Sequence, residues 1–181
     1  MLKKNFRKKA LSLRKKKFNS SSKINLFEIT NIIKKKNLKK PIIGGYFPVN
    51  YEIDCLNILK FLDKKEIKIS LPSIKKNNQM KFYYWSFKDP LILNKFGIPE
   101  PIPSTEVYPD ILLVPIVAFD RLKYRVGYGG GYYDRYLDKI SKIKNYLSIG
   151  FAFSFQKINK VPKNKYDKKL DYILTEKYLI K

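Results

Sequence analysis

The sequence predicts a layered α/β protein that forms a single domain over residues 1–181. Segments with apolar residues at helical spacing alternate along the chain with short apolar runs, as in proteins whose helices pack on a sheet. The clearest unit is residues 111–137, where an apolar run, a glycine cluster and an aromatic helical pattern follow one another. A length of 181 residues and an apolar content of 44% suit one sizeable core.

Residues 2–17 predict an amphipathic helix. Its apolar positions recur at helical spacing and are Leu2, Phe6, Ala10 and Leu13. Lys3, Arg7 and Arg14 lie near one another on a neighbouring stripe. Spacing alone favours an ordinary basic helix with a solvated charged face.

The next elements follow a polar break at residues 19–22. A second helix is predicted from the apolar face formed by Leu26, Ile29 and Ile33. Residues 41–47 predict a strand that leads into a loop. Asp54 can cap a third helix, whose apolar repeat is Leu56, Leu59 and Leu62. Glu52 stands alone among apolar and basic residues, where helix-end electrostatics would account for it.

The remaining elements are mostly strands. Residues 67–71 and 80–85 predict two strands joined by a polar turn, and residues 97–101 predict a rigid turn. The apolar run at residues 111–117 predicts the central strand, and residues 147–153 predict another after the aromatic helix. That helix begins near Tyr132, and its apolar face comprises Tyr132, Tyr133, Tyr136, Leu137 and Ile140.

The glycine cluster, residues 127–131, holds four of the chain's eight glycines. Glycine reaches positive φ easily and lets a ligand approach the backbone, and the N–H groups that open the next helix attract anions. Arg125 and Arg135 flank the cluster and could clamp phosphate oxygens. Asp134 suits the first turn of the helix and could also hold a metal near bound phosphate. A tight structural turn explains the cluster equally well, because Tyr132 breaks both the Walker A and the dinucleotide patterns.

Composition excludes several classes of protein. The chain has one cysteine and no histidine, which rules out an intrachain disulfide framework, a histidine-based triad and a histidine–zinc site. The basic N-terminus lacks an apolar core typical of a secretory signal, and no apolar run is long enough to span a bilayer. We therefore expect a cytoplasmic protein without a membrane partner. We also expect a monomer.

The net charge of +24 raises the possibility of a nucleic-acid partner. Lysine, asparagine, isoleucine, tyrosine and phenylalanine are all abundant and all have AT-rich codons, so genome composition offers another explanation. The lysines are also dispersed along the chain. We expect no specific nucleic-acid partner, and any such binding should be weak and salt-dependent.

Residues 114–137, VPIVAFDRLKYRVGYGGGYYDRYL, closely resemble the signature of the 5-formyltetrahydrofolate cyclo-ligase family. Residues 3–7 resemble the family's Lys-x-x-Leu-Arg motif, with Phe6 in place of leucine. Residues 46–54, YFPVNYEID, are similar to the family's folate-site segment, and residues 97–101 to its Gly-Ile-x-Glu-Pro turn. Residues 170–175 match a C-terminal segment, although Tyr166 stands where the family often has histidine.

The resemblance implies a three-layer α/β/α domain with a mostly parallel central sheet. It also implies ATP-dependent conversion of 5-formyltetrahydrofolate to 5,10-methenyltetrahydrofolate, with Mg²⁺ and with release of ADP and phosphate. Phosphorylation of the formyl oxygen would create a leaving group, and the neighbouring folate nitrogen would then close the ring. Such chemistry depends on positioning and charge neutralisation more than on a protein nucleophile.

The same resemblance assigns roles to individual residues. The implied ATP contacts are Lys3, Lys4, Asn5, Phe6, Arg7, Arg125, Val126, Gly127, Tyr128, Gly129, Gly130, Gly131, Tyr132 and Tyr133. The implied folate contacts are Phe47, Glu52, Tyr128, Gly129, Gly130, Gly131 and Tyr132. Arg125 and Tyr132 are the implied catalytic residues, and Asp134 and Asp171 the implied Mg²⁺ ligands. Two other functions stay open, a nucleic-acid-binding protein and a non-folate enzyme on a similar scaffold, such as a sugar-phosphate isomerase.

Overall fold

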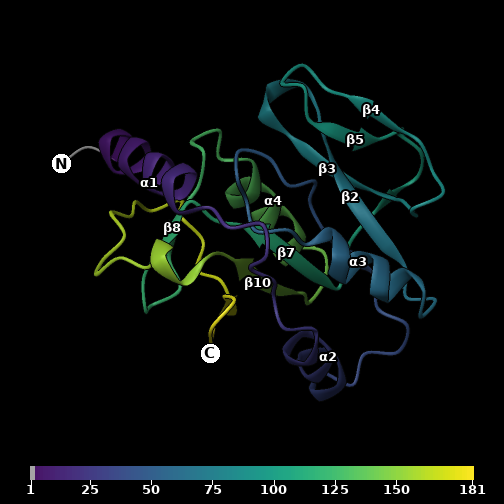
Figure 1. The fold of residues 1–181 in the computed structure, drawn as a ribbon. Helices are drawn as coiled ribbons and strands as arrows, with labels where there is room; N and C mark the ends of the chain where they lie inside the picture. The colour runs from purple at the N-terminus through teal and green to yellow at the C-terminus, as the bar shows by residue number, and fades with distance from the viewer. Residues whose placement is uncertain (1–2) are drawn as a thin grey trace.

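The computed structural model describes residues 3–181 and is built on an eight-stranded sheet, in the order β12-β11-β10-β7-β1-β2-β3-β6 (Figure 1). Its five inner strands run parallel to one another. They are β11 (Tyr172–Leu174), β10 (Leu147–Phe151), β7 (Ile111–Pro115), β1 (Ile43–Gly44) and β2 (Ile69–Ile74). Antiparallel strands complete both edges, namely β12 (Leu179–Ile180), β3 (Met80–Tyr84) and β6 (Glu106–Val107).

Helices cover both faces of this sheet, which confirms the predicted three-layer α/β/α architecture. Alternate residues of β7 belong to different cores, because side chains alternate across a strand. Ile111 and Leu113 pack in one core with apolar residues of α2 (Leu26–Lys35) and α3 (Leu56–Asp63). Leu112 and Val114 pack in the other core with α4 (Tyr132–Ser141).

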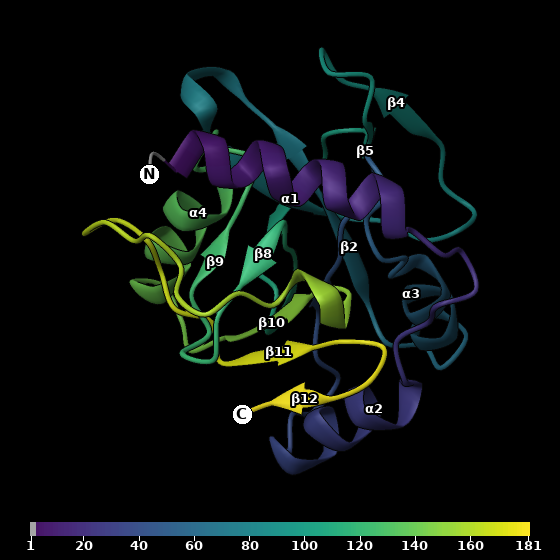
Figure 2. The same ribbon diagram turned by 60° about the vertical axis from the view of Figure 1, so that its left-hand side comes forward.

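The first helix, α1 (Lys3–Lys17), belongs to neither covering layer. It lies across the molecule above a small hairpin of β8 (Ala118–Phe119) and β9 (Arg125–Val126), which follows the carboxyl end of β7 (Figure 2). Ala10 and Leu11 of α1 pack there on a small apolar cluster formed by Val117, Ala118, Val126 and Val161. The helix therefore crosses the carboxyl edge of the parallel strands, the edge where open α/β sheets bind ligands.

The expected elements are present with some shifted limits. Leu2, expected in the first helix, lies outside the described residues. The strand expected at residues 41–47 is only two residues long as β1, because the chain leaves the sheet at Gly45. A Cβ atom on Gly45 would lie 2.4 Å from Leu59, so glycine lets α3 pack closely here. The polar loop before the glycine cluster contains the β8–β9 hairpin, which the sequence did not reveal.

Two further features complete the chain. β4 (Leu91–Leu93) and β5 (Pro99–Pro101) form a hairpin, with Gly97 at a φ of +70° in the connection. The turn predicted at residues 97–101 is therefore wrong for residues 99–101, which pair with β4 as a strand. Short 3-10 turns follow β2 and β10, at Lys76–Asn78 and Ser154–Gln156. Among residues 3–181, no helix combines the length and the apolar character that crossing a bilayer requires.

Candidate active site

The glycine loop, residues 127–131, leaves the carboxyl edge of the sheet and is covered by α1. Arg7 donates from Nε to the carbonyl oxygen of Gly127 at 2.7 Å. Gly129 has a φ of +107°, and a Cβ atom there would lie 2.9 Å from the Arg7 guanidinium carbon. Gly131 precedes α4 with a φ of +66° and has no side chain to cap the helix. A guanidinium and the uncapped N–H groups of a helix therefore meet at one loop, as an anion site requires.

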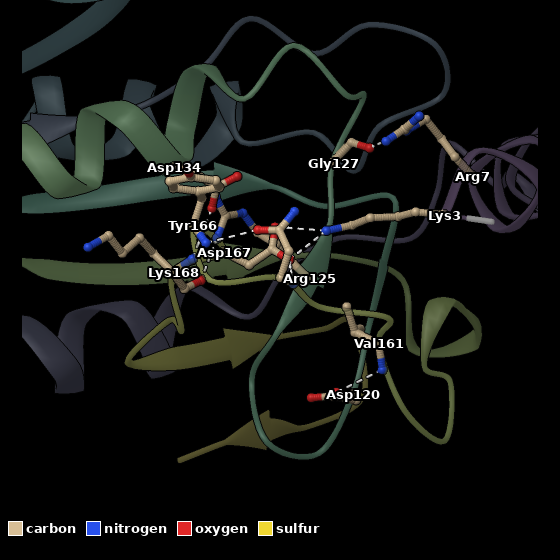
Figure 3. A network of polar contacts seen from close by, with 11 residues as sticks. Lys3, Arg7, Asp120, Arg125, Gly127, Asp134, Val161, Tyr166, Asp167 and Lys168 are labelled. Atoms are coloured by element: carbon tan, nitrogen blue, oxygen red, sulfur yellow. Dashed lines mark hydrogen bonds and ion pairs between the residues drawn. The ribbon is translucent and has the colours of Figure 1, made fainter. Parts of the chain in front are cut away.

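Acidic residues lie beside this loop (Figure 3). Lys3 of α1 is paired with both carboxylate oxygens of Asp167, each at 2.7 Å. Arg125 is buried and donates to Asp134 Oδ1 and to the carbonyl oxygen of Lys168, both at 2.8 Å. The Lys168 N–H donates to the same Asp134 oxygen at 3.1 Å. One connected set of contacts thus joins α1, β9, α4 and the C-terminal segment.

Glu52 lies near Tyr128 of the loop, on the segment between β1 and α3. It is 6% exposed, and its Oε2 accepts the Val49 N–H at 2.9 Å. Burial raises the pKa of Glu52 to about 7, against the opposing effects of the Val49 N–H, the Arg14 charge and the Tyr128 hydroxyl. Buried carboxylates are normally satisfied by partners. Here Glu52 Oε1 and the Tyr133 hydroxyl are buried without a hydrogen-bond partner.

An apolar crevice of about 240 Å³ lies between α1 and the segments that follow β7 and β10. Phe6, Ala10 and Leu13 form its α1 side. Val117, Ala118, Phe155 and Ile158 form most of the other side. The crevice therefore lies along the same helix that presents Lys3 and Arg7 to the glycine loop.

Comparison with known proteins gives this arrangement its context. The model of the 5-formyltetrahydrofolate cyclo-ligase family matches residues 3–176, which include α1, the Glu52 segment and the glycine loop. The chain belongs to this family. Members of the family convert 5-formyltetrahydrofolate to 5,10-methenyltetrahydrofolate with ATP.

Individual relatives agree with that assignment. The chain is 31% identical to the 5-formyltetrahydrofolate cyclo-ligase of Haemophilus influenzae over 153 residues, which cover 80% of this chain and 79% of the relative. It is 30% identical to the Mycoplasma genitalium cyclo-ligase over 166 residues, 86% and 88% of the two chains. The solution structure of the Aquifex aeolicus 5,10-methenyltetrahydrofolate synthetase shares its fold with a TM-score of 0.79 and 32% identity, over 99% of this chain and 92% of that one.

The structure brings together most of the residues that the family resemblance had implied. Lys3, Phe6, Arg7 and the glycine loop lie at one edge, whereas Lys4 and Asn5 are exposed on α1. Tyr128 and Glu52 lie together, and Phe47 is half-buried on the Glu52 segment. Val126 is an exception, because its side chain is fully buried in the apolar cluster below α1 and can offer a ligand only its backbone.

Two arginines have protein partners in place of the expected phosphates. The Arg125 guanidinium is used by Asp134 and Lys168. Arg135 turns to the carbonyl oxygens of Gly130 and Asn78. Tyr132 lies on that side too, and its hydroxyl donates to Asn78 at 3.2 Å. Arg135 and Tyr132 therefore both bind Asn78, and Arg135 also binds the glycine loop at Gly130.

The expected Mg²⁺ pair is not brought together. Asp171 lies at the amino edge of the sheet, where its Oδ2 accepts from the N–H and the hydroxyl of Ser148 at 2.8 and 2.7 Å. Asp134 lies at the start of α4, and Asp167 lies beside it on the C-terminal segment. Within residues 3–181, no three histidine, cysteine, aspartate or glutamate side chains are grouped to hold a metal ion.

Sequence reasoning had not assigned two of the site's residues. Asp167 has no distinguishing pattern in the sequence, and only its contact with Lys3 shows its position. Arg14 shares a helical stripe with Lys3 and Arg7, but the stripe gives no indication of burial. In the structure Arg14 is 0% exposed and touches the glycine loop through Tyr128. Tyr166, the departure from the family pattern, is mostly exposed.

Proposed function

We propose that this chain converts 5-formyltetrahydrofolate to 5,10-methenyltetrahydrofolate, with ATP consumed to ADP and phosphate. The glycine loop is the main support for the proposal, because it contacts both a group suited to ATP phosphates and a group suited to folate. Arg7 rests on Gly127 and Gly129, where the phosphates of ATP would lie. Tyr128 of the same loop lies beside Glu52, an acceptor suited to the donor-rich pterin ring. The reacting ends of both substrates would thus meet at one place.

The reaction needs ATP because the formyl oxygen is a poor leaving group. The γ-phosphoryl group passes to that oxygen, the bond to ADP breaks, and an iminium phosphate forms. The neighbouring folate nitrogen then attacks the formyl carbon and loses its proton to solvent, the ring closes, and the C–O bond breaks with release of phosphate. Negative charge moves between phosphate oxygens throughout, so fixed cations and N–H groups supply most of the stabilisation.

The positive groups that meet this need lie on α1 and at the loop. The Arg7 guanidinium faces the loop, and the N–H groups that open α4 add partial positive charge. Lys3 is held at the same edge by Asp167. Arg125 acts indirectly, because it fixes the position of Asp134. This role differs from the direct catalytic contact that the family resemblance had implied.

Mg²⁺ fits this site through Asp134 and Asp167. Mg²⁺ commonly takes one or two carboxylates together with substrate phosphates, so a cluster of three protein ligands is not required. Asp134 accepts both the Arg125 and the Lys168 hydrogen bonds through Oδ1, so Oδ2 is not used by these two partners and could bind the metal. Asp167 would exchange Lys3 for the metal. When bound, the metal would neutralise phosphate charge, while Asp134 and Asp167 hold its position.

The apolar crevice suits the base of ATP. Phe6 and Ala10 line it, and both lie within two turns of Lys3 and Arg7 on α1. The crevice borders β8, whose partner β9 leads directly into the glycine loop. A nucleotide with its phosphates on the loop could therefore place a flat aromatic ring against Phe6. This placement gives Phe6 a physical role where the family motif has leucine.

The proposal is tested with purified protein, 5-formyltetrahydrofolate and Mg-ATP. We expect the near-ultraviolet absorbance of the methenyl product to rise, with one ADP and one phosphate released per product. Omission of ATP should abolish the signal. Absence of methenyl product, under conditions where a known cyclo-ligase is active, would reject the assignment.

A further inference from the structure

Arg14 is a charged side chain buried within the apolar contacts of α1. Its side chain is 0% exposed. One terminal nitrogen donates to the carbonyl oxygen of Ile116 at 3.2 Å, and the other donates to the Tyr128 hydroxyl. The guanidinium also lies over the Tyr128 ring, 5.5 Å from its centroid, while Nε has no hydrogen-bond partner. A buried cation needs a counter-charge, because isolated charges are strongly disfavoured in an interior.

Glu52 is the carboxylate on which this charge acts, because the positive charge of Arg14 lowers the pKa of Glu52 against the larger, opposing effect of burial. The groups that lower the pKa of Glu52 are the Val49 N–H, Arg14 of α1 and the Tyr128 hydroxyl of the glycine loop, and the Glu52 charge in turn raises the pKa values of Tyr46, Cys55 and Tyr133. Burial raises the pKa values of Tyr46, Cys55, Tyr128 and Tyr133, so these groups stay neutral near pH 7. Arg14 is therefore the source of positive charge that favours ionised Glu52.

We propose that Arg14 is a positioning residue of the folate site, which holds Tyr128 and the Glu52 carboxylate in the arrangement that receives the pterin ring. The inference rests on the proposed function of Glu52 as a folate contact. It adds a link between the two substrates, because Arg14 lies on the helix that carries Lys3 and Arg7. Eleven residues separate Lys3 from Arg14, about 16 Å along one rigid helix. ATP binding that fixes the start of α1 would thereby also fix Glu52.

The direct test is the ionisation of Glu52, which needs no activity. Carboxyl carbon NMR of protein labelled in its glutamate side chains gives the titration midpoint, with Glu52→Gln to assign the signal. The wild-type midpoint should lie at about 7. Arg14→Met should move it upward by about one pH unit or more, a tenfold change in the ratio of the two forms. Lys15→Met removes one positive charge from an exposed neighbour on the same helix and should leave it unchanged.

Two outcomes overturn the proposal. An unmoved midpoint in Arg14→Met would show that Arg14 does not act on Glu52. Equal movement in Arg14→Met and Lys15→Met would show only a general effect of net charge. If Arg14→Met does not fold, Arg14→Lys and Tyr128→Phe replace it. The first variant keeps the charge and should preserve the midpoint, whereas the second loses the hydroxyl beside Glu52 and should raise it.

Kinetics then separate positioning from simple structural support. In Arg14→Met, the acid limb of kcat/KM for 5-formyltetrahydrofolate should move to higher pH, and the affinity for ATP in the absence of folate, measured by calorimetry, should stay within about twofold. Equal losses for both substrates at every pH would overturn the proposal. If the wild-type protein has no cyclo-ligase activity, the proposed function fails, while the NMR titration still decides whether Arg14 controls Glu52.

Discussion

The substitution Asp134→Asn separates the structural role of this carboxylate from the metal role that we propose for it. Asparagine keeps an oxygen that can accept from Lys168 and Arg125, but it removes the charge that faces a buried guanidinium. The Arg125–Asp134 pair is partly buried, so loss of one of its charges costs about 1–1.5 kcal/mol, more than for an exposed ion pair and less than for a fully buried one. The lost favourable charge in the first turn of α4 adds about 0.3–1 kcal/mol.

The expected total is about 1.3–2.5 kcal/mol, which lowers the melting temperature of a protein of this size by about 3–10 °C. The matched control is Asp138→Asn, one turn later on α4. Its pairs with Lys142 and Lys168 are exposed, so its melting temperature should not change measurably. Equal melting temperatures for wild type and Asp134→Asn would refute the view that this pair stabilises the fold.

The same variants test the metal role through titration of the rate with Mg²⁺. Asp134→Asn and Asp167→Asn should both need much more Mg²⁺ and lose turnover by orders of magnitude. Asp171→Asn should follow the wild-type curve, because Asp171 binds Ser148 at the other edge of the sheet. If Asp171→Asn shifts the curve and Asp167→Asn does not, the assignment made from the structure is wrong.

Arg7→Ala and Lys3→Ala each remove a cation from the phosphate site, so ATP affinity should fall about ten- to a hundredfold by calorimetry, with folate affinity retained. Ala10→Trp fills the crevice beside Phe6, so it should weaken the binding of ATP but not the binding of inorganic tripolyphosphate. Equal loss of affinity for both would show that the adenine base binds elsewhere. Glu52→Gln should lower kcat/KM for folate with ATP binding intact. Because burial raises the pKa of Glu52 to about 7, wild-type kcat/KM for folate should fall as the pH drops below about 7, and this limb should be absent from Glu52→Gln.

Local patterns predicted the elements that pack on the sheet. In α4, Tyr136, Leu137 and Ile140 recur at helical spacing, and all three are buried against the sheet as expected. The spacing works because one face of such a helix must leave water. Burial without a strand explains the error at residues 41–47. The apolar residues there continue past the two paired residues of β1 into a buried loop, and apolar character alone does not distinguish the two.

Long-range partners explain what the sequence could not show. Arg14 looks like a solvated charge on α1, and its burial depends on Tyr128 and Ile116, more than one hundred residues away. Asp167 and Asp171 are the same residue type and lie four positions apart. Only the β10–β11 pairing places Asp171 at the amino edge, and only Lys3 marks Asp167 at the opposite one. Residue type therefore indicated the chemistry, whereas topology decided which carboxylate takes part.

The contact between Lys3 and Asp167 joins residues 164 positions apart, which has a consequence for synthesis of the chain on the ribosome. At about 5–20 residues per second, roughly 8–30 s pass between the emergence of α1 and that of its partner. During this interval the apolar side of α1 has no surface to cover it, since Val117, Ala118, Val126 and Val161 are also made late. The nascent chain would therefore complete its proposed ATP site last, and a ribosome that stalls before residue 161 would leave the apolar side of α1 partly uncovered.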